Sequence, residues 1–249
     1  MKNKRSIIPN FFTMSNMVIG FIAIIVASKG TKEGIALAGT LVFVASFFDL
    51  FDGAAARALN VESEIGGQLD SLADAVSYGI APGIIAYQAY FQSFPQIGFG
   101  INAGMLFAAV FPLCATYRLA RFNVEDDNKK GFTGLPSPAA GIMVAAIPAL
   151  EISKIPFFGI IHDFVPLWLY IIIFLGSAFL MITQVDYNKL FNDLFKKGKT
   201  IAIIIILLMA AFLVVFKMWA VFIVISLYIV LGLIIYCLKS IAHDVNKEQ

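Results

Sequence analysis

Long apolar stretches separated by short polar connections make up most of the chain. A helix needs about 20 apolar residues to cross the ~30 Å hydrocarbon core of a bilayer. Eight stretches approach or exceed that length, at residues 11–28, 35–59, 68–92, 99–121, 136–152, 165–184, 200–216 and 218–240. The pattern therefore predicts an all-α polytopic membrane protein with about eight transmembrane helices.

Composition supports lipid as the solvent of this protein. Apolar residues make up 60% of the 249 residues and charged residues only 14%, against about 25% charged in a typical soluble domain. The mean hydropathy is +0.87. A soluble protein of this composition would expose more apolar surface than water tolerates. The net charge of +2 gives no indication of a nucleic-acid partner, so membrane lipids are the expected surroundings.

The basic residues predict the orientation in the membrane, because cytoplasmic loops carry an excess of Lys and Arg. If the N-terminus is cytoplasmic and there are eight spans, both termini are cytoplasmic. All but four of the 18 basic residues then lie on the inner side. The four exceptions are Lys29, Lys32, Lys154 and Lys217. The asymmetry supports an even number of spans.

Four aspartates stand inside two of the predicted spans. Asp49 and Asp52 belong to the second span, and Asp70 and Asp74 to the third. An ionised aspartate at the centre of a spanning helix costs about 2.5–3.5 kcal/mol on insertion scales. A lone membrane aspartate can serve as a helix–helix hydrogen bond, but four within 26 positions require another reason.

The spacing of these carboxylates suggests a metal site. Asp49 and Asp52 are three residues apart, Asp70 and Asp74 are four apart, and each pair therefore projects from one face of its helix. A short connection, at about residues 60–66, would make the helices antiparallel neighbours. Converging carboxylates repel each other in a low dielectric, and two divalent cations, Mg²⁺ or Mn²⁺, would neutralise them. A cation or proton pathway remains a rival interpretation.

Residues around the aspartates are typical of a phosphate-binding site. Gly53 and the alanines at 54–56 remove bulk, so a ligand can approach the backbone closely. Arg57 follows Asp49 by two helical turns and can bond a phosphate. Gly66 and Gly67 keep the start of the facing helix open, and either Ser63 or Glu64 is a candidate cap for that helix.

The aspartates belong to a longer motif. The run Asp49-Leu-Phe-Asp52-Gly-Ala-Ala-Ala-Arg57, followed by Gly66, Asp70 and Asp74, matches every fixed position of D-x-x-D-G-x-x-A-R-x8-G-x3-D-x3-D. This pattern resembles the signature of the CDP-alcohol phosphatidyltransferase family. The resemblance implies a six-helix catalytic core within residues 1–184 and two added C-terminal helices at 200–240. Between them, residues 185–199 fit a short interfacial helix or a solvated loop equally well.

A narrower resemblance covers most of residues 7–141. The segments IPNFFTMSN, SEIGGQLDSLADAVSYGIAPG, YRLARFN and GFTGLPSPAAG are similar to the serine-using branch of that family. This implies transfer of a phosphatidyl group from CDP-diacylglycerol to L-serine, giving phosphatidylserine and CMP, by a homodimeric enzyme. Glycerol 3-phosphate, inositol phosphate and choline remain alternative acceptors. A carboxylate-based cation transporter is the alternative from a different class.

The resemblance also implies residue roles. Asp49, Asp52 and Asp70 would be metal ligands, and Asp74 both a ligand and the general base. Contacts with the CDP-lipid are implied for Asn10, Thr13, Gly53, Ala56, Arg57, Ser63 and Gly66. Structural alternatives exist for two of these, because Asn10 can cap a helix and Thr13 can bond to backbone.

Acceptor contacts are expected at the inner end of the fourth span. Arg118 and Arg121 are three residues apart and share a helix face. An arginine fork suits a carboxylate or a phosphate, so one would bind the serine carboxylate and the other the lipid phosphate, with help from Asn123. Anchoring at lipid headgroups is the alternative interpretation for both arginines.

Overall fold

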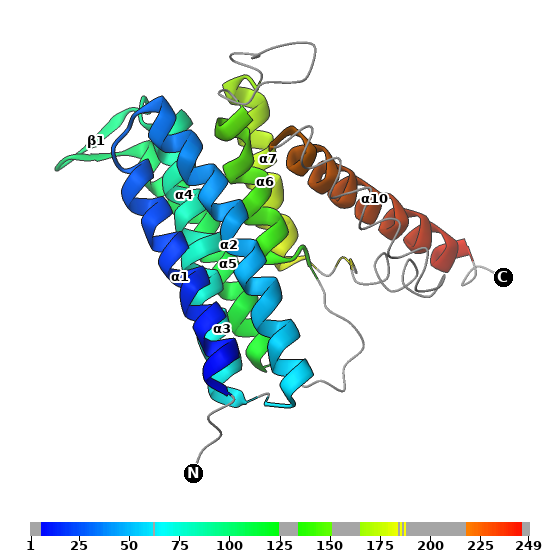
Figure 1. Ribbon diagram of the computed structural model, residues 1–249. Helices are drawn as coiled ribbons and strands as arrows, with labels where there is room; N and C mark the ends of the chain where they lie inside the picture. Colours follow the sequence, from blue (N-terminus) through cyan, green and yellow to red (C-terminus); the bar gives the residue numbers. More distant parts are fainter. Residues whose placement is uncertain are drawn as a thin grey trace.

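The computed structural model describes residues 6–61, 63–124, 134–150, 165–183, 185, 187 and 218–245, the last seven of these by backbone alone. Nearly all of this part of the chain is helical (Figure 1). Its α-helices are α1 (Ile7–Ala27), α2 (Lys32–Leu59), α3 (Glu64–Asp74), α4 (Ala81–Ala86), α5 (Ala103–Val124), α6 (Ser137–Leu150), α7 (Leu167–Ile182) and α10 (Met218–Val245). Two π-helical turns, η2 (Ala75–Ile80) and η3 (Tyr87–Phe91), continue α3 and α4.

These helices confirm an all-α membrane fold, but they do not confirm eight spans. Every predicted span has a helical counterpart in the described residues except 200–216, which lies outside them. Among the described residues, four helices are long and apolar enough to cross a membrane: Ile7–Ala27, Lys32–Leu59, Ala103–Val124 and Met218–Leu238. The helices α6 and α7 are apolar but shorter. Of the predicted interfacial segment at 185–199, only residues 185 and 187 are among the described residues, so that prediction is not tested.

Caps explain where α2 and α3 begin and end. The Thr31 side chain accepts a hydrogen bond from the Gly34 N–H at 3.1 Å and starts α2. Asn60, in the left-handed conformation with φ 50°, ends it. Ser63 starts α3 by accepting from the Gly66 N–H at 3.1 Å, which confirms its predicted capping role. The connection is therefore residues 60–63, shorter than the predicted 60–66.

Helix α1 packs along both α2 and α3 (Figure 1). Of all the elements that α3 contacts, α1 is the one with the most extensive contact. Consequently the first turns of α1 cover one side of the space between α2 and α3. The sequence predicts that α2 and α3 are antiparallel neighbours. In the structure they come together through their facing ends and through α1, with little direct packing of their backbones.

A short hairpin replaces the start of the predicted span at 99–121. Strands β1 (Gln96–Gly98) and β2 (Ile101–Asn102) pair antiparallel, with Gln96 opposite Asn102. Gly98, Phe99 and Gly100 all have positive φ, which no helix accommodates. Helix α5 therefore starts at Ala103, and the predicted start at residue 99 is wrong.

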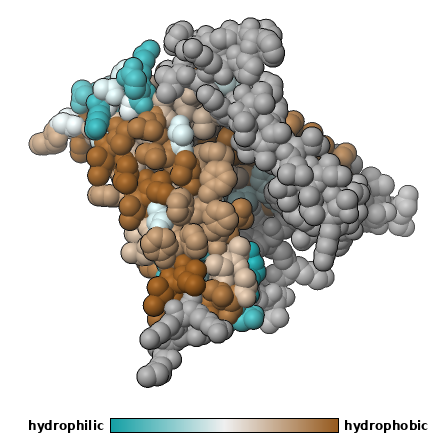
Figure 2. Space-filling model, in the orientation of Figure 1, coloured by the Kyte–Doolittle hydropathy of each residue, from teal (hydrophilic) through white to brown (hydrophobic). Residues whose placement is uncertain are grey.

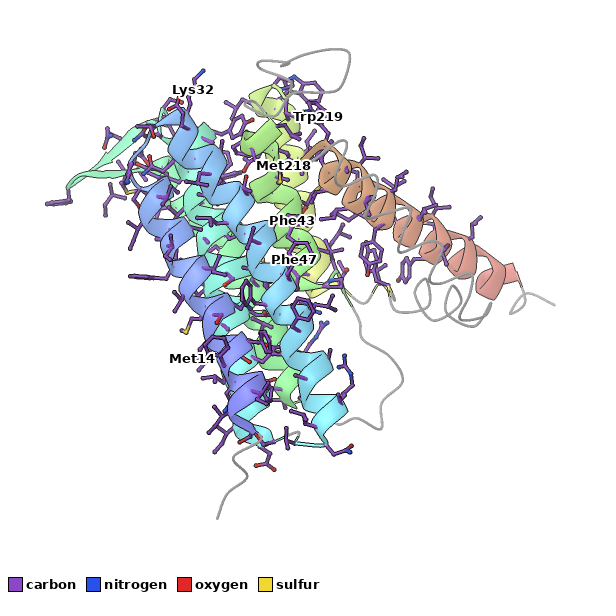
Figure 3. The ribbon with its side chains drawn as sticks, in the orientation of Figure 1. Met14, Lys32, Phe43, Phe47, Met218 and Trp219 are labelled. Atoms are coloured by element: carbon purple, nitrogen blue, oxygen red, sulfur yellow. The ribbon has the colours of Figure 1, made fainter. Side chains whose placement is uncertain are left out.

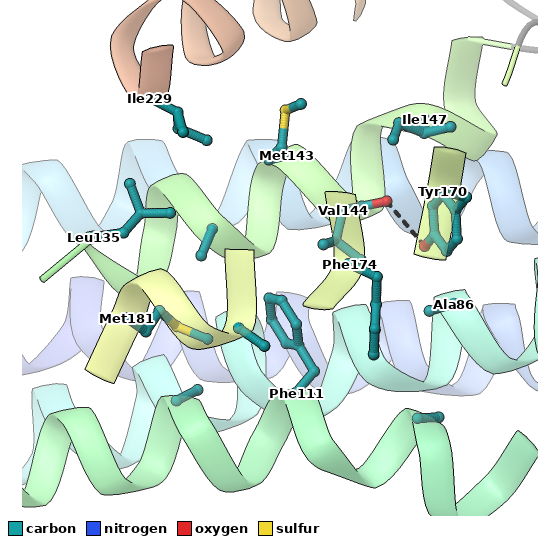
Figure 4. Close-up of a cluster of buried hydrophobic side chains, with 14 of the residues drawn as sticks. Ala86, Phe111, Leu135, Met143, Val144, Ile147, Tyr170, Phe174, Met181 and Ile229 are labelled. Carbon is teal, nitrogen blue, oxygen red and sulfur yellow. Dashed lines mark hydrogen bonds between the residues drawn. The ribbon is translucent and has the colours of Figure 1, made fainter. Parts of the chain in front are cut away.

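Two apolar clusters hold the helices together. In the first, Phe111 of α5 packs on Phe174 of α7 with ring centroids 5.3 Å apart, and the Tyr170 hydroxyl donates to the Val144 carbonyl at 3.3 Å (Figure 4). The second joins α1, α2, α6 and the start of α10, where Met218 and Trp219 lie (Figure 3). Small residues permit the close approach of α2 and α6, since Gly39 lies directly on the Ala145 carbonyl.

The outer face of α1 and α2 is apolar. Figure 2 shows hydrophobic residues over most of this face, with hydrophilic ones gathered toward its ends. Phe11, Val18 and Phe21 of α1 are each more than half exposed, and Met14 points away from the bundle (Figure 3). Such a surface is stable in lipid rather than in water.

Candidate active site

Three of the four predicted aspartates meet between the second half of α2 and the second half of α3. One carboxylate oxygen from each of Asp49, Asp70 and Asp74 lies within 4.8 Å of the other two. Asp49 comes from α2, and the other two come from α3. The predicted convergence of the two helices on one acidic cluster is therefore what the structure shows for these three residues.

Asp52 lies beside this trio but is not part of it. Its side chain is 6% exposed, and its Oδ2 atom has no hydrogen-bond partner in the described residues. The Thr13 hydroxyl of α1 and the Arg57 side chain both lie near its carboxylate. Asp52 thus links the acidic trio to the neighbouring cavity, whose wall it shares with Asp70.

A cavity of about 220 Å³ opens next to the aspartates, between α1, α2 and α3. All seven residues predicted to contact the CDP-lipid line it: Asn10, Thr13, Gly53, Ala56, Arg57, Ser63 and Gly66. Gly67, which the sequence predicts to keep the start of α3 open, also lines the cavity, whereas Pro9 and Val61 were not predicted as parts of its wall. Pro9 adjoins Asn10, but nothing in the sequence marked Val61.

Three glycines, Gly53, Gly66 and Gly67, leave room in the cavity because they have no side chain. A Cβ atom added at Gly53 would lie 3.3 Å from the Arg57 Nη1 atom, so the guanidinium lies over the bare backbone of Gly53. At Gly66 an added Cβ would lie 3.1 Å from the Ser63 hydroxyl and 3.9 Å from Asn10 Oδ1. A Cβ at Gly67 would meet no described atom within 4 Å. The start of α3 is therefore open to a ligand on this side.

The structure distinguishes the alternatives left for Asn10 and Thr13. Helix α1 begins at Ile7, so Asn10 lies in its second turn and is not an N-cap; that alternative is wrong. The Thr13 hydroxyl donates to the Pro9 carbonyl at 3.1 Å, as the backbone-bonding alternative predicts. Because Thr13 also lines the cavity, this bond does not remove it from the site.

Arg118 and Arg121 have different surroundings. Arg118 is 7% exposed and donates through Nη1 to the Ser137 hydroxyl at 2.9 Å, while its Nε has no partner in the described residues. It lies within electrostatic reach of Asp74. Arg121 donates through Nη1 to the Ile182 carbonyl at 3.1 Å. Arg118 is therefore the arginine that faces the acidic cluster.

Asn123 connects α5 to α3. Its Oδ1 accepts from the Ser71 hydroxyl at 3.1 Å, and its Nδ2 donates to Gln68 Oε1 at 3.2 Å. These bonds hold the middle of α3 against the end of α5, a contact that the sequence did not indicate.

The acidic cluster fits divalent cations. Asp52 Oδ2, Asp70 Oδ1 and Asp74 Oδ1 are all buried without a hydrogen-bond partner in the described residues. Unpaired buried carboxylate oxygens carry a large desolvation cost. Hard cations such as Mg²⁺ and Mn²⁺ prefer such oxygen ligands. The residues present are thus suited to hold a cation between α2 and α3.

Comparison with known proteins assigns the chain to a family. The sequence profile of the CDP-alcohol phosphatidyltransferases matches residues 6–157, more than half of the 249 residues. The chain belongs to the CDP-alcohol phosphatidyltransferase family. The matched region contains the whole acidic cluster and the cavity beside it. The protein is therefore an enzyme of the phosphotransferase class.

Individual relatives in this family carry a more specific name. The chain is 30% identical to a CDP-diacylglycerol–serine O-phosphatidyltransferase of Helicobacter pylori, over 99% of this chain and 98% of the relative. It is 36% identical to a protein of the same name from Bacillus subtilis, over 56% of this chain and 74% of the relative. A third protein of this name, from Methanocaldococcus jannaschii, is 30% identical over 76% of this chain and 77% of the relative.

Proposed function

We propose that this phosphatidyltransferase moves the phosphatidyl group of CDP-diacylglycerol to L-serine, producing phosphatidylserine and CMP. The observation that carries the proposal is the meeting of Asp49, Asp70 and Asp74 beside a cavity built from the family motif. The names of the relatives support serine as the acceptor, including one that aligns along nearly the whole chain.

The cavity between α1, α2 and α3 would receive the CDP moiety. Arg57, whose guanidinium lies over Gly53, supplies a fixed positive charge for a phosphate. The bare backbone at Gly53, Gly66 and Gly67 admits the diphosphate without steric conflict. The acyl chains would extend into the bilayer that surrounds the apolar outer face of α1.

Two Mg²⁺ or Mn²⁺ ions would be held by Asp49, Asp52, Asp70 and Asp74. When bound, such ions stabilise negative charge on the diphosphate and on the departing CMP. Without them the carboxylates repel each other across a few ångströms. The protein contributes a rigid arrangement of ligands, because the four side chains come from two helices that α1 holds together.

Asp74 would act as the general base. The serine hydroxyl oxygen attacks the phosphorus that bears diacylglycerol, the bond from that phosphorus to CMP breaks, and the hydroxyl proton passes to Asp74. A free hydroxyl is a poor nucleophile, and a positioned base contributes about 10²–10⁴-fold in rate. The burial of Asp74, which is 8% exposed, keeps bulk water from competing for the proton.

Arg118 would bind the serine carboxylate, and Arg121 the lipid phosphate. The support for Arg118 is its burial, its unpartnered Nε and its position within electrostatic reach of Asp74. A carboxylate bound there would place the serine hydroxyl near the base. The direct bonds of Asn123 to α3 support an indirect role for that residue, through the position of the helix.

Replacing Arg118 by glutamine is expected to raise the KM for serine about 10- to 100-fold, since a hydrogen bond to a charged group is worth about 1.5–3 kcal/mol. The KM for CDP-diacylglycerol should change little. Initial rates of CMP release, with serine varied in one series and CDP-diacylglycerol in another, measure the two constants. Lys32→Gln, at the opposite end of α2 (Figure 3), is the control. An unchanged serine KM in Arg118→Gln would remove Arg118 from the acceptor site.

The remaining expectations about the whole protein belong to the same proposal. The bias of basic residues supports a cytoplasmic active site with both termini on that side. The family resemblance supports a homodimer, and a core at 1–184 followed by a C-terminal hairpin at 200–240. Light scattering of the purified protein in detergent measures the oligomeric state, with a monomer as the contradicting result.

One assay tests the proposed reaction. Purified protein receives CDP-diacylglycerol, Mn²⁺ or Mg²⁺, and one of serine, glycerol 3-phosphate or inositol phosphate, and CMP release is measured. Release with serine and not with the other two acceptors is the expected result. Release only with another alcohol would contradict serine as the acceptor. No release with any of them, together with cation flux into vesicles, would favour a transporter.

A further inference from the structure

The π-helical turn η2, which directly follows Asp74, is fixed by glycine contacts with three other helices. Gly20 of α1 lies directly on Ser77. A Cβ added at Gly141 of α6 would come within 2.8 Å of the backbone of Tyr78. Gly79, in the turn itself, faces Ala115 of α5 at 3.2 Å from an added Cβ. Backbones pack this closely only where side chains are absent, so the turn has little freedom to move.

Tyr78 is the large side chain that this turn presents to the protein interior. It is fully buried, and its hydroxyl has no hydrogen-bond partner in the described residues. It follows Asp74 by four residues and so leaves the helical segment on nearly the same side. The four aspartates lie within electrostatic reach of Tyr78, so this side chain and the acidic cluster belong to the same region of the protein.

Two buried polar groups in this region, one a donor and one an acceptor, lack a hydrogen-bond partner among the described residues. Besides the Tyr78 hydroxyl, the Oδ1 atom of Asp74 is buried and unpaired within the described residues. A buried polar group without a partner costs about 1–3 kcal/mol. Ser77, next to Tyr78, is satisfied, since its hydroxyl donates to the Asn16 carbonyl at 3.0 Å. The unmet donor in the turn is therefore specific to Tyr78 and not a property of the whole turn.

We infer that Tyr78 is a positioning residue of the acidic site, whose phenolic hydroxyl donates a hydrogen bond to the Asp49–Asp74 carboxylate pair when cations are bound. The inference rests on the proposed metal site. Donors behind metal-binding carboxylates fix the orientation of the ligands, and their loss costs about 10–100-fold in metal affinity or activity. The glycine contacts explain how the turn holds the tyrosine ring in place.

Direct measurement of Mn²⁺ binding by electron paramagnetic resonance tests this role in the purified full-length protein. Tyr78→Phe keeps the ring and removes only the hydroxyl, so the melting temperature without metal should not fall. Its Kd for Mn²⁺ should rise about 10- to 100-fold. CMP release should show a similar rise in the Mn²⁺ concentration for half-maximal rate, with much of kcat recovered at saturating Mn²⁺.

Tyr187→Phe is the matched control. Tyr187 is 1% exposed and its hydroxyl also lacks a partner among the described residues, but it lies against Tyr228 rather than the aspartates. The Kd of the Tyr187→Phe protein for Mn²⁺ should equal that of the wild type. If Tyr78→Phe also binds Mn²⁺ with the wild-type Kd, the inference is overturned while the proposed function stands. If the wild-type protein binds no Mn²⁺, both are overturned.

Discussion

Replacing Asp74 by asparagine is expected to lower kcat for CMP release about 10⁴-fold, the upper part of the range for loss of a positioned base. Asparagine keeps the size of the side chain but cannot accept the proton of the serine hydroxyl. The same change removes a carboxylate from the acidic trio, so metal binding should weaken too. Single-turnover and steady-state CMP release, each at saturating substrates, measure the effect.

Raising the Mn²⁺ concentration should not restore Asp74→Asn, because a bound cation does not replace the base. Glu33→Gln provides a control, since Glu33 is an exposed carboxylate in the first turn of α2, at the far end of that helix. That variant should retain the wild-type rate. Recovery of Asp74→Asn to within tenfold of the wild type at high Mn²⁺ would show that Asp74 is a ligand and not the base.

Replacing Asp70 by asparagine should lower CMP release about 10²–10³-fold at moderate metal concentration, comparable to the loss of one group that stabilises a transition-state charge. Unlike Asp74→Asn, this variant should recover part of its rate as Mn²⁺ is raised, since the base remains. In the absence of metal its melting temperature should rise, because one of the mutually repelling carboxylates has lost its charge.

Differential scanning fluorimetry with and without Mn²⁺ provides the second measurement on Asp70→Asn. The stabilisation by Mn²⁺ should be smaller than in the wild type, as expected when a ligand binds the folded state less tightly. Full turnover at low metal, with an unchanged Mn²⁺-induced stabilisation, is the result that would exclude Asp70 from the metal site.

The acidic site was largely predictable from sequence, because its residues are fixed by spacing along two helices. Carboxylates three or four positions apart share a helix face, and a connection of a few residues brings the two faces together. Helical spacing also carried Gly53, Ala56 and Arg57 to the same wall of the cavity. The motif thus specifies much of the site before any tertiary contact is known.

Features that depend on backbone conformation were not predictable in this way. Val61 reaches the cavity because Asn60 adopts a left-handed conformation, which shortens the connection to α3. The π-helical turn at Ala75–Ile80 is indistinguishable from an α-helix in an apolar pattern, since both are continuous apolar stretches. Positive φ at Phe99 is uncommon for a bulky residue, so the hairpin was expected to be helix.

Contacts between distant segments were also hidden from the sequence. The different surroundings of Arg118 and Arg121 follow from what α6 and α7 place beside them, namely the Ser137 hydroxyl and the Ile182 carbonyl. The spacing of the two arginines indicated only a shared face. The bonds from Asn123 to α3 likewise depend on how α5 is packed, which no local pattern records.

The central claim is that two helices bring aspartates together because divalent cations bind between them. Crystals of the protein grown with Mn²⁺ and CDP-diacylglycerol, measured at the manganese absorption edge, test it most directly. Anomalous density for two ions between the α2 and α3 aspartates, in contact with the diphosphate, is the predicted result. A fully active protein whose map shows bound nucleotide but no anomalous density among Asp49, Asp70 and Asp74 would contradict it.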